Sequence, residues 1–251
     1  MAGHSKWANI KHRKAAQDKK RGKQFAKLIR AIESAAREAS SADPATSPSL
    51  ALAVQKARDA DVPKDNIERA CLRGAGLDDG GARYEAATYE GYAPGGVAVL
   101  VEVLTDNRNR TASDVRSLFT RAGGNLAEPG AVGFLFSRRG QVLLAAGAGE
   151  DDVLAAGLDH GLEDVEDGGD EVVAWCGAGD VAPLRAALEA AGLPVTGAGT
   201  TMVASTSVRV EEADEVGRVL RLLDALEDLD DVQDVHANLD VDDDLLAAAG
   251  T

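Results

Sequence analysis

Apolar residues recur at helical spacing in the first third of the chain. Within residues 17–41 they fall at positions i, i+3, i+4 and i+7, with Lys and Arg on the other face, which predicts an amphipathic helix. The four positions are Phe25, Leu28, Ile29 and Ile32. Ser47 followed by Pro48 is typical of an N-cap with proline at the first helical position, so a second helix should run to about residue 60.

A third helix is predicted directly after the second. Asp65 and Glu68 have the spacing of a capping box, and Gly74 would end the helix that they begin. Three short helices joined by brief loops predict a small helical domain. The stretch 74–82 is rich in glycine and aspartate, which is typical of a linker.

Beyond this linker, apolar runs of strand length alternate with helical stretches. Residues 97–104 are almost all apolar, which predicts a buried strand, and Thr111 and Asp114 have capping-box spacing for a helix that Gly123 and Gly124 end. Further strands are predicted at 134–136, 141–146, 172–175, 201–210 and 232–241, and further helices at 150–160, 180–192 and 211–228. The alternation predicts an α+β protein in which two units each have a sheet with helices on one side.

Charge is distributed very unevenly along the chain, whose net charge is −15. Residues 1–30 contain ten Lys or Arg and one acid, a net of +9, whereas residues 140–251 contain four Arg and 26 acids, a net of −22. A basic arm on an acidic protein indicates a specific polyanion as partner, because the rest of the surface repels polyanions. We expect that partner to be nucleic acid, and structured RNA in particular.

The arm supplies cations for phosphates and rings that can stack on unpaired bases. The predicted contacts are Lys6, Lys11, Arg13, Lys14, Lys19, Lys20, Arg21 and Lys23, with His4, Trp7 and His12 as the rings. The alternative is a solubilising tail whose Trp7 only packs on the helical domain.

A second candidate for phosphate binding is the segment 105–111. Arg108 and Arg110 could hold a phosphate there, beside the start of the predicted helix. The segment fits equally well a polar connector in which both arginines pair with neighbouring acids, so both interpretations stay open.

The residue patterns that mark enzymes and metal sites are absent from the sequence. Two cysteines and four histidines do not fall at zinc-site spacing, and no glycine-rich segment completes a dinucleotide fingerprint or a phosphate loop. We therefore expect no catalytic residue, metal or cofactor, and buried or free thiols at Cys71 and Cys176. A secretory signal and an apolar run of roughly 18 residues are also absent, so we expect a cytoplasmic protein without a membrane segment.

Several long motifs together resemble one known family. The chain opens with Met-Ala-Gly-His-Ser-Lys-Trp-Ala-Asn-Ile-Lys-His-Arg-Lys, and the likeness continues at residues 63–70, 89–98, 104–111, 123–126 and 231–235. On these motifs the chain resembles the YebC/PmpR family, which includes a mitochondrial translational activator of a cytochrome oxidase subunit. It departs from the family pattern at Ala93, where glycine is usual, and at residues 236–238.

The resemblance implies three domains: a basic arm and helical bundle at 1–78, an α+β domain at 79–133 plus 207–251, and a third α+β domain at 134–206 inserted in the second. It also implies a non-enzymatic regulator of gene expression. The interpretation that we favour from the sequence is a ribosome-associated translation factor that relieves stalling at proline runs, with ribosomal RNA as its ligand. The alternatives are a transcriptional regulator that binds promoter DNA and, from another class, an α+β module that senses a metabolite.

Overall fold

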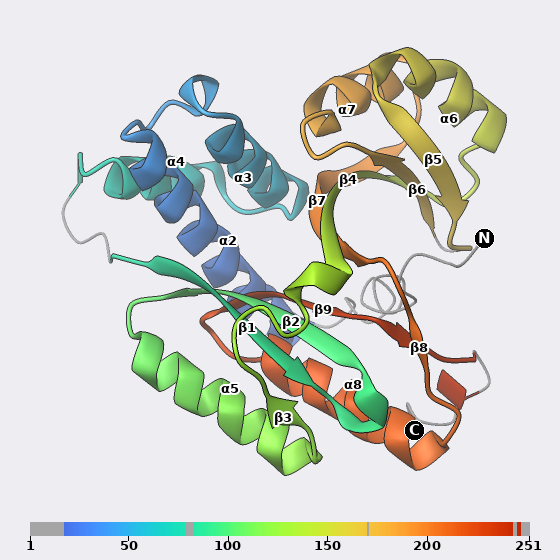
Figure 1. The fold of residues 1–251 in the computed structure, drawn as a ribbon. Coiled ribbons are helices and arrows are strands. Elements are labelled where there is room, and N and C mark those ends of the chain that lie inside the picture. Colours follow the sequence, from blue (N-terminus) through green and yellow to red (C-terminus); the bar gives the residue numbers. More distant parts are fainter. Residues whose placement is uncertain (1–17, 79–82, 170, 243–244, 247–251) are drawn as a thin grey trace. The chain divides into compact units, whose positions relative to one another are not determined.

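The computed structural model describes residues 18–78, 83–169, 171–242 and 245–246 (Figure 1). The chain divides into two compact units, each built from separate stretches. The first contains Met1–Ser34, Gly80–Ser137 and Val203–Thr251, and the second contains Ala35–Asp79 and Arg138–Met202. The predicted α+β class is confirmed, while the domain boundaries at 78, 133 and 206 stay a prediction.

The first unit contains a four-stranded antiparallel sheet in the order β3-β1-β2-β9. Its strands are β1 (Glu85–Tyr92), β2 (Ala98–Thr105), β3 (Asn125–Leu126) and β9 (Val232–Ala237). A short parallel pair, β8 (Val208–Arg209) and β10 (Leu239–Asp240), belongs to the same unit. Because β9 pairs with β2, the last part of the chain completes a sheet that residues 85–105 begin.

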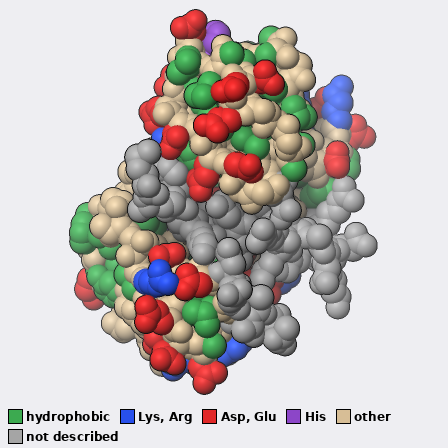
Figure 2. Space-filling model, turned by 90° about the vertical axis from the view of Figure 1, so that its right-hand side faces the viewer, with side chains coloured by type: hydrophobic (Ala, Val, Ile, Leu, Met, Phe, Trp, Pro, Cys, Tyr) green, Lys and Arg blue, Asp and Glu red, His purple; other side chains and the backbone are tan. Residues whose placement is uncertain are grey.

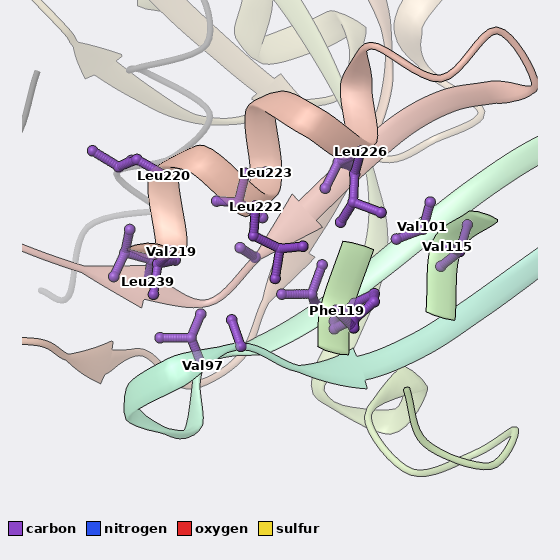
Figure 3. Close-up of a cluster of buried hydrophobic side chains, with 14 of the residues drawn as sticks. Val97, Val101, Val115, Phe119, Val219, Leu220, Leu222, Leu223, Leu226 and Leu239 are labelled. Carbon is purple, nitrogen blue, oxygen red and sulfur yellow. The ribbon is translucent and has the colours of Figure 1, made fainter. Parts of the chain in front are cut away.

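Two helices, α5 (Arg108–Ala122) and α8 (Ala213–Glu227), lie side by side on one face of this sheet (Figure 1). The core between them is aliphatic with one aromatic ring: Val101 of β2, Phe119 of α5 and Leu223 of α8 are all buried (Figure 3). Period-3.6 burial along both helices turns these side chains toward the sheet, and β2 is buried at every position from Ala98 to Val101, beyond which burial alternates. The core fixes the orientation of α5, whose other side faces solvent.

The helical region begins with α2 (Asp18–Ala39), whose first part belongs to the first unit and whose last residues belong to the second. It is followed by the 3-10 turn η1 (Pro44–Thr46), α3 (Pro48–Asp59) and α4 (Lys64–Gly74). Ser47 caps α3 as predicted, since its hydroxyl accepts from the amide of Leu50. None of the helices in the described ranges has both the length and the apolar character needed to cross a membrane.

The second unit contains the sheet β5-β6-β4-β7, with α6 (Glu150–Gly157) and α7 (Val181–Ala190) contributing to its core. The strands are β4 (Phe136–Ala145), β5 (Leu162–Asp167), β6 (Glu171–Cys176) and β7 (Val195–Ala204). Arg185 of α7 forms a bidentate ion pair with Asp59 of α3, at 2.6 and 2.9 Å, which ties the helical part of this unit to the sheet-bearing part.

Several predictions about helix and strand boundaries are wrong, among them the predicted strand 201–210, which covers the end of β7 and the separate β8. The third helix begins at Lys64 with Pro63 at its N-cap position, so Asp65 lies in the first turn and does not cap. Residues 134–136 and 141–146 are not two strands, because β4 runs without a break from Phe136 to Ala145. Arg139 does not interrupt it, since its guanidinium pairs with Glu163 and lies over the ring of Trp175.

Three strands are not predicted from the sequence: β1, β3 and β5. β1 is poor in branched apolar residues, β3 has only two residues, and the acidic β5 resembles a solvated loop in sequence. In each case pairing with a neighbouring strand determines the conformation, and the local sequence does not reveal that neighbour.

Replacing Phe119 by Ala should destabilise the protein by about 3–5 kcal/mol, because the ring is fully buried between the sheet and α8. Chemical denaturation, monitored by circular dichroism, measures the change. Phe134→Ala is the matched control, since Phe134 is 76% exposed and its loss should cost no more than about 0.5 kcal/mol. Equal losses for the two variants would contradict this description of the core.

Candidate nucleic-acid interface

The segment that joins β2 to α5 carries the two arginines predicted to bind phosphate. The predicted capping box at Thr111 and Asp114 is wrong, because α5 already begins at Arg108. Asn107 is the N-cap, and its side-chain oxygen accepts from the amide of Arg110 at 3.1 Å. Arg108 and Arg110 therefore lie in the first turn of the helix and not in a loop.

The carboxylate of Asp231 is hydrogen-bonded to several polar side chains around this turn. It accepts hydrogen bonds from the hydroxyls of Thr105 and Thr111, at 3.1 and 2.7 Å, and from the guanidinium of Arg110 at 2.7 Å. Arg30 of α2 reaches its other oxygen at 3.3 Å. Asp231 directly precedes β9, so the carboxylate joins α2, the end of β2, the start of α5 and the start of β9.

The surroundings of Asp231 favour its charged form. Burial raises the pKa of the carboxyl, but the hydrogen bonds from Arg110, Thr111 and Thr105 and the charge of Arg110 outweigh burial, so the pKa lies below its ordinary value. Asp231 and Asp106 in turn raise the pKa of Arg110. Thus Arg110 is held by two carboxylates, as the polar-connector interpretation expects of both arginines, whereas Arg108 forms no ion pair with a described residue.

Three cations of α2 bind the C-terminal end of α8. The ammonium groups of Lys23 and Lys27 donate to the backbone carbonyls of Asp228 and Glu227, and Arg30 donates to the carbonyl of Asp230. The last carbonyls of a helix lack partners within the helix and carry its negative dipole end, so cations are favourable there. The root of the basic arm is therefore attached to the body by the arm's own charges.

The predicted contact residues differ in what the structure says of them. Lys23 lies on α2 and is engaged with Asp228, through the carbonyl at 3.1 Å and the carboxylate at 3.8 Å. The other arm residues lie outside the residues whose side chains are described; they are His4, Lys6, Trp7, Lys11, His12, Arg13, Lys14, Lys19, Lys20 and Arg21. Their assignment to nucleic-acid binding stays a prediction.

Sequence reasoning missed the roles of Arg30 and Asp231. Asp231 belongs to the motif 231–235 on which the family resemblance depends, but nothing in the motif indicates its partners. Its contact with Arg110 joins residues 121 positions apart. Only the folded arrangement brings these groups together.

Both cysteines and His236 are buried in the part of the chain that the structure describes. Cys71 and Cys176 are both free and buried, as predicted, and burial raises the pKa of Cys176 to about 11, unlike the lowered pKa of a reactive thiol. The buried ring of His236 contacts the carboxylate of Glu102 at 3.2 Å. Among the described residues no three potential ligand side chains come together as a metal site would require.

Two family models match almost the whole chain. One describes the TACO1/YebC protein N-terminal domain and matches residues 5–77, and the other describes the TACO1/YebC second and third domain and matches residues 84–239. The chain belongs to the TACO1/YebC family. The resemblance drawn from its sequence motifs is thereby confirmed.

Curated relatives match over their full length. A probable transcriptional regulatory protein of Beutenbergia cavernae is 56% identical and covers 98% of both chains, and those of Salinispora arenicola and Streptomyces avermitilis are each 52% identical and cover at least 98%. The crystal structure of a conserved hypothetical protein from Aquifex aeolicus has a TM-score of 0.85 and 42% identity, and covers 95% of this chain and 98% of that one. Members of the TACO1/YebC family are thus named as regulators, and this chain has their fold.

Replacing Asp231 by Asn should lower the free energy of unfolding by about 2–3 kcal/mol at pH 7, because Arg110 and the two threonines lose a charged acceptor. The native pKa of Asp231 is depressed, so its contribution is complete above the ordinary carboxyl pKa and is lost as the pH falls through the native value. Urea unfolding of wild type and Asp231→Asn between pH 7 and pH 2 measures the difference in their free energies of unfolding. This difference should disappear in acid.

The control for this experiment is Asp106→Asn, which removes the exposed partner of Arg110 and should cost less than about 1 kcal/mol. A gap between wild type and Asp231→Asn that stayed constant down to pH 2 would contradict the proposed charge state.

Proposed function

We propose that the protein is a non-enzymatic regulator of transcription that binds nucleic acid through its basic N-terminal arm. The observation that carries the proposal is the contrast between the arm, with a net charge of +9 over residues 1–30, and the acidic remainder. Relatives that match over their full length at 52% identity or more are named probable transcriptional regulatory proteins. These names support transcription as the step that the protein regulates.

The acidic body restricts where a polyanion can bind. Asp and Glu side chains are prominent on the face drawn in Figure 2, where Lys and Arg are few. Phosphates approaching such a surface are repelled, and the repulsion is strongest at low salt. Binding through the arm lets the nucleic acid remain outside most of this field.

The described α4 helix is a poor candidate for a recognition helix that enters a DNA groove. This favours the arm as the element that contacts the nucleic acid. α3 and α4 are joined by a four-residue connection, as in a helix-turn-helix, but α4 carries Asp65 and Glu68 along with its cations. Arg69 is already used, since it donates to the side chain of Asn66 and to the carbonyl of Asp65.

The second candidate function is that of a ribosome-associated translation factor that relieves stalling at sequences such as proline runs. Two features favour it. The rings of the arm suit unpaired RNA bases, and the net charge of α4 is only +1, from three cations and two acids, which is small for binding to a duplex groove. Its ligand would be ribosomal RNA. Binding of the arm to phosphates is common to both candidates, so the choice between them depends on the partner.

Removing four positive charges from the arm should strongly weaken binding of the full chain to a DNA duplex of about 30 base pairs. The variant replaces Lys6, Lys11, Arg13 and Lys14 by Ala. The slope of log K against log salt should become shallower by about 3–4, since four phosphate contacts are lost. Fluorescence anisotropy at several salt concentrations measures both quantities.

The matched control exchanges the three lysines for Arg, which keeps the charge and should keep the slope. An unchanged slope in the Ala variant would remove the arm from the proposal. Equal binding to a promoter fragment and to a scrambled duplex, together with arm-dependent pelleting with ribosomes, would favour the translation factor over the transcriptional regulator.

A further inference from the structure

The exposed side of α5 carries arginines that no described carboxylate neutralises. The helix contains four arginines and one acid, Asp114, within a strongly acidic body. Arg110 is held by Asp231 and Asp106, but Arg108, Arg116 and Arg121 form no ion pair with any described residue. Several arginines elsewhere in the body do have acidic partners, namely Arg139 with Glu163, Arg185 with Asp59 and Arg209 with Asp242.

The polar residues of α5 are gathered by its periodicity into one broad outer face. Thr111, Val115 and Phe119 are buried against the sheet, so the opposite side is solvent-exposed. That side is here called the α5 outer face. It consists of Asn109, Ser113, Asp114, Arg116, Ser117, Thr120 and Arg121. The exposed large apolar side chains of the described residues all lie outside it; they are Leu72, Leu77, Tyr92, Phe134 and Leu158.

The neighbouring helix adds two arginines, although α8 as a whole contains two arginines and four acids. Arg218 and Arg221 are exposed on α8, which packs beside α5. The guanidinium of Arg218 lies 4.0 Å from the position that a Cβ on Gly123 would take, directly after the end of α5. Glu215 offsets part of the charge of Arg218, at 3.8 Å. The end of α5 that carries Arg121 is therefore flanked by a second cation.

We propose that the α5 outer face is a second nucleic-acid-binding surface, in which Arg116 and Arg121 bind backbone phosphates and the hydroxyls of Ser113 and Ser117 support them. The inference deepens the proposed function and rests on it. The chemistry fits phosphates because arginine forms bidentate hydrogen bonds with them and Ser, Thr and Asn donate to phosphate oxygens. No lysine follows Lys64 in the sequence, so every cation of this surface has the planar guanidinium geometry.

The absence of apolar anchors on the described α5 outer face favours nucleic acid over a protein partner. Protein interfaces depend on a few buried aromatic or aliphatic side chains, and the exposed residues of this face are polar or charged. At a rise of about 1.5 Å per residue, the two ends of the α5 outer face, Asn109 and Arg121, lie about 18 Å apart along the helix. Such a length is sufficient for contacts with several successive phosphates of one strand.

The test uses the full chain with Arg116→Gln and Arg121→Gln together. Two fluorescein-labelled probes of the same sequence, a single-stranded RNA of about 30 nucleotides and a DNA duplex of about 30 base pairs, distinguish the two sources of phosphate. On the bound probe the salt slope should become shallower by about 1.4 for single strands or about 1.8 for the duplex, and affinity should fall about tenfold at low salt. The matched control, Arg69→Gln with Arg209→Gln, removes the same charge from arginines that already have partners.

A second variant guards against an effect on folding. Ser113→Asp with Ser117→Asp keeps every arginine but places negative charge on the α5 outer face, and it should weaken binding at least as much. Both positions are exposed, so thermal unfolding should be nearly unchanged. If both variants bind like the Arg69 and Arg209 control, the α5 outer face is not a binding surface and the inference is overturned, while the arm remains. A wild-type chain that binds neither probe would instead overturn the proposed function itself.

Discussion

The first unit depends on one buried negative charge. The side chain of Asp231 is only 12% exposed, and a carboxylate in that position is costly unless several donors surround it. Two hydroxyls and two guanidinium groups do so here, and they come from α2, β2 and α5. Separating any of these elements would leave the carboxylate with an unmatched charge, so the network fixes the base of the arm and the start of α5 in one frame.

This network divides the arginines into two groups with different physical roles. Arg30 and Arg110 are held by Asp231, and their charge is largely neutralised where it lies. Arg116 and Arg121 lie further along the same helix and have no such partner among the described residues. The ion pair of Arg110 holds the first turn of α5, so it positions the helix that carries the side chains that we propose to contact phosphate.

Local patterns were sufficient to predict the amphipathic helices, the cap at Ser47 and the buried strand near residues 97–104. They failed where a distant partner determines the structure. Asn107 caps α5 through the amide of Arg110, and Thr111 lies inside the helix with its hydroxyl bonded to Asp231, far along the chain. The acidic β5 is a strand because β6 pairs with it, and its Glu163 and Glu166 are matched by Arg139 and the indole of Trp175. The charge pattern of the sequence is sufficient to identify the candidate arm. Only the structure shows which arginines form ion pairs with described carboxylates and which do not.

The acidity of the body is best understood as part of its specificity. Long-range repulsion by a net charge of −22 over residues 140–251 disfavours phosphates almost everywhere, so a phosphate-binding surface in this protein must be locally dense in unpaired cations. In the two surfaces that we propose, cations are gathered in different ways: the arm has a run of lysines in its sequence, and helical periodicity brings arginines to the α5 outer face. A polyanion that contacts both the arm and the α5 outer face would gain two sets of contacts. A polyanion that contacts only one of these surfaces would meet the same repulsion with fewer favourable contacts. Discrimination between ligands therefore follows from the acidic background as much as from the basic contacts.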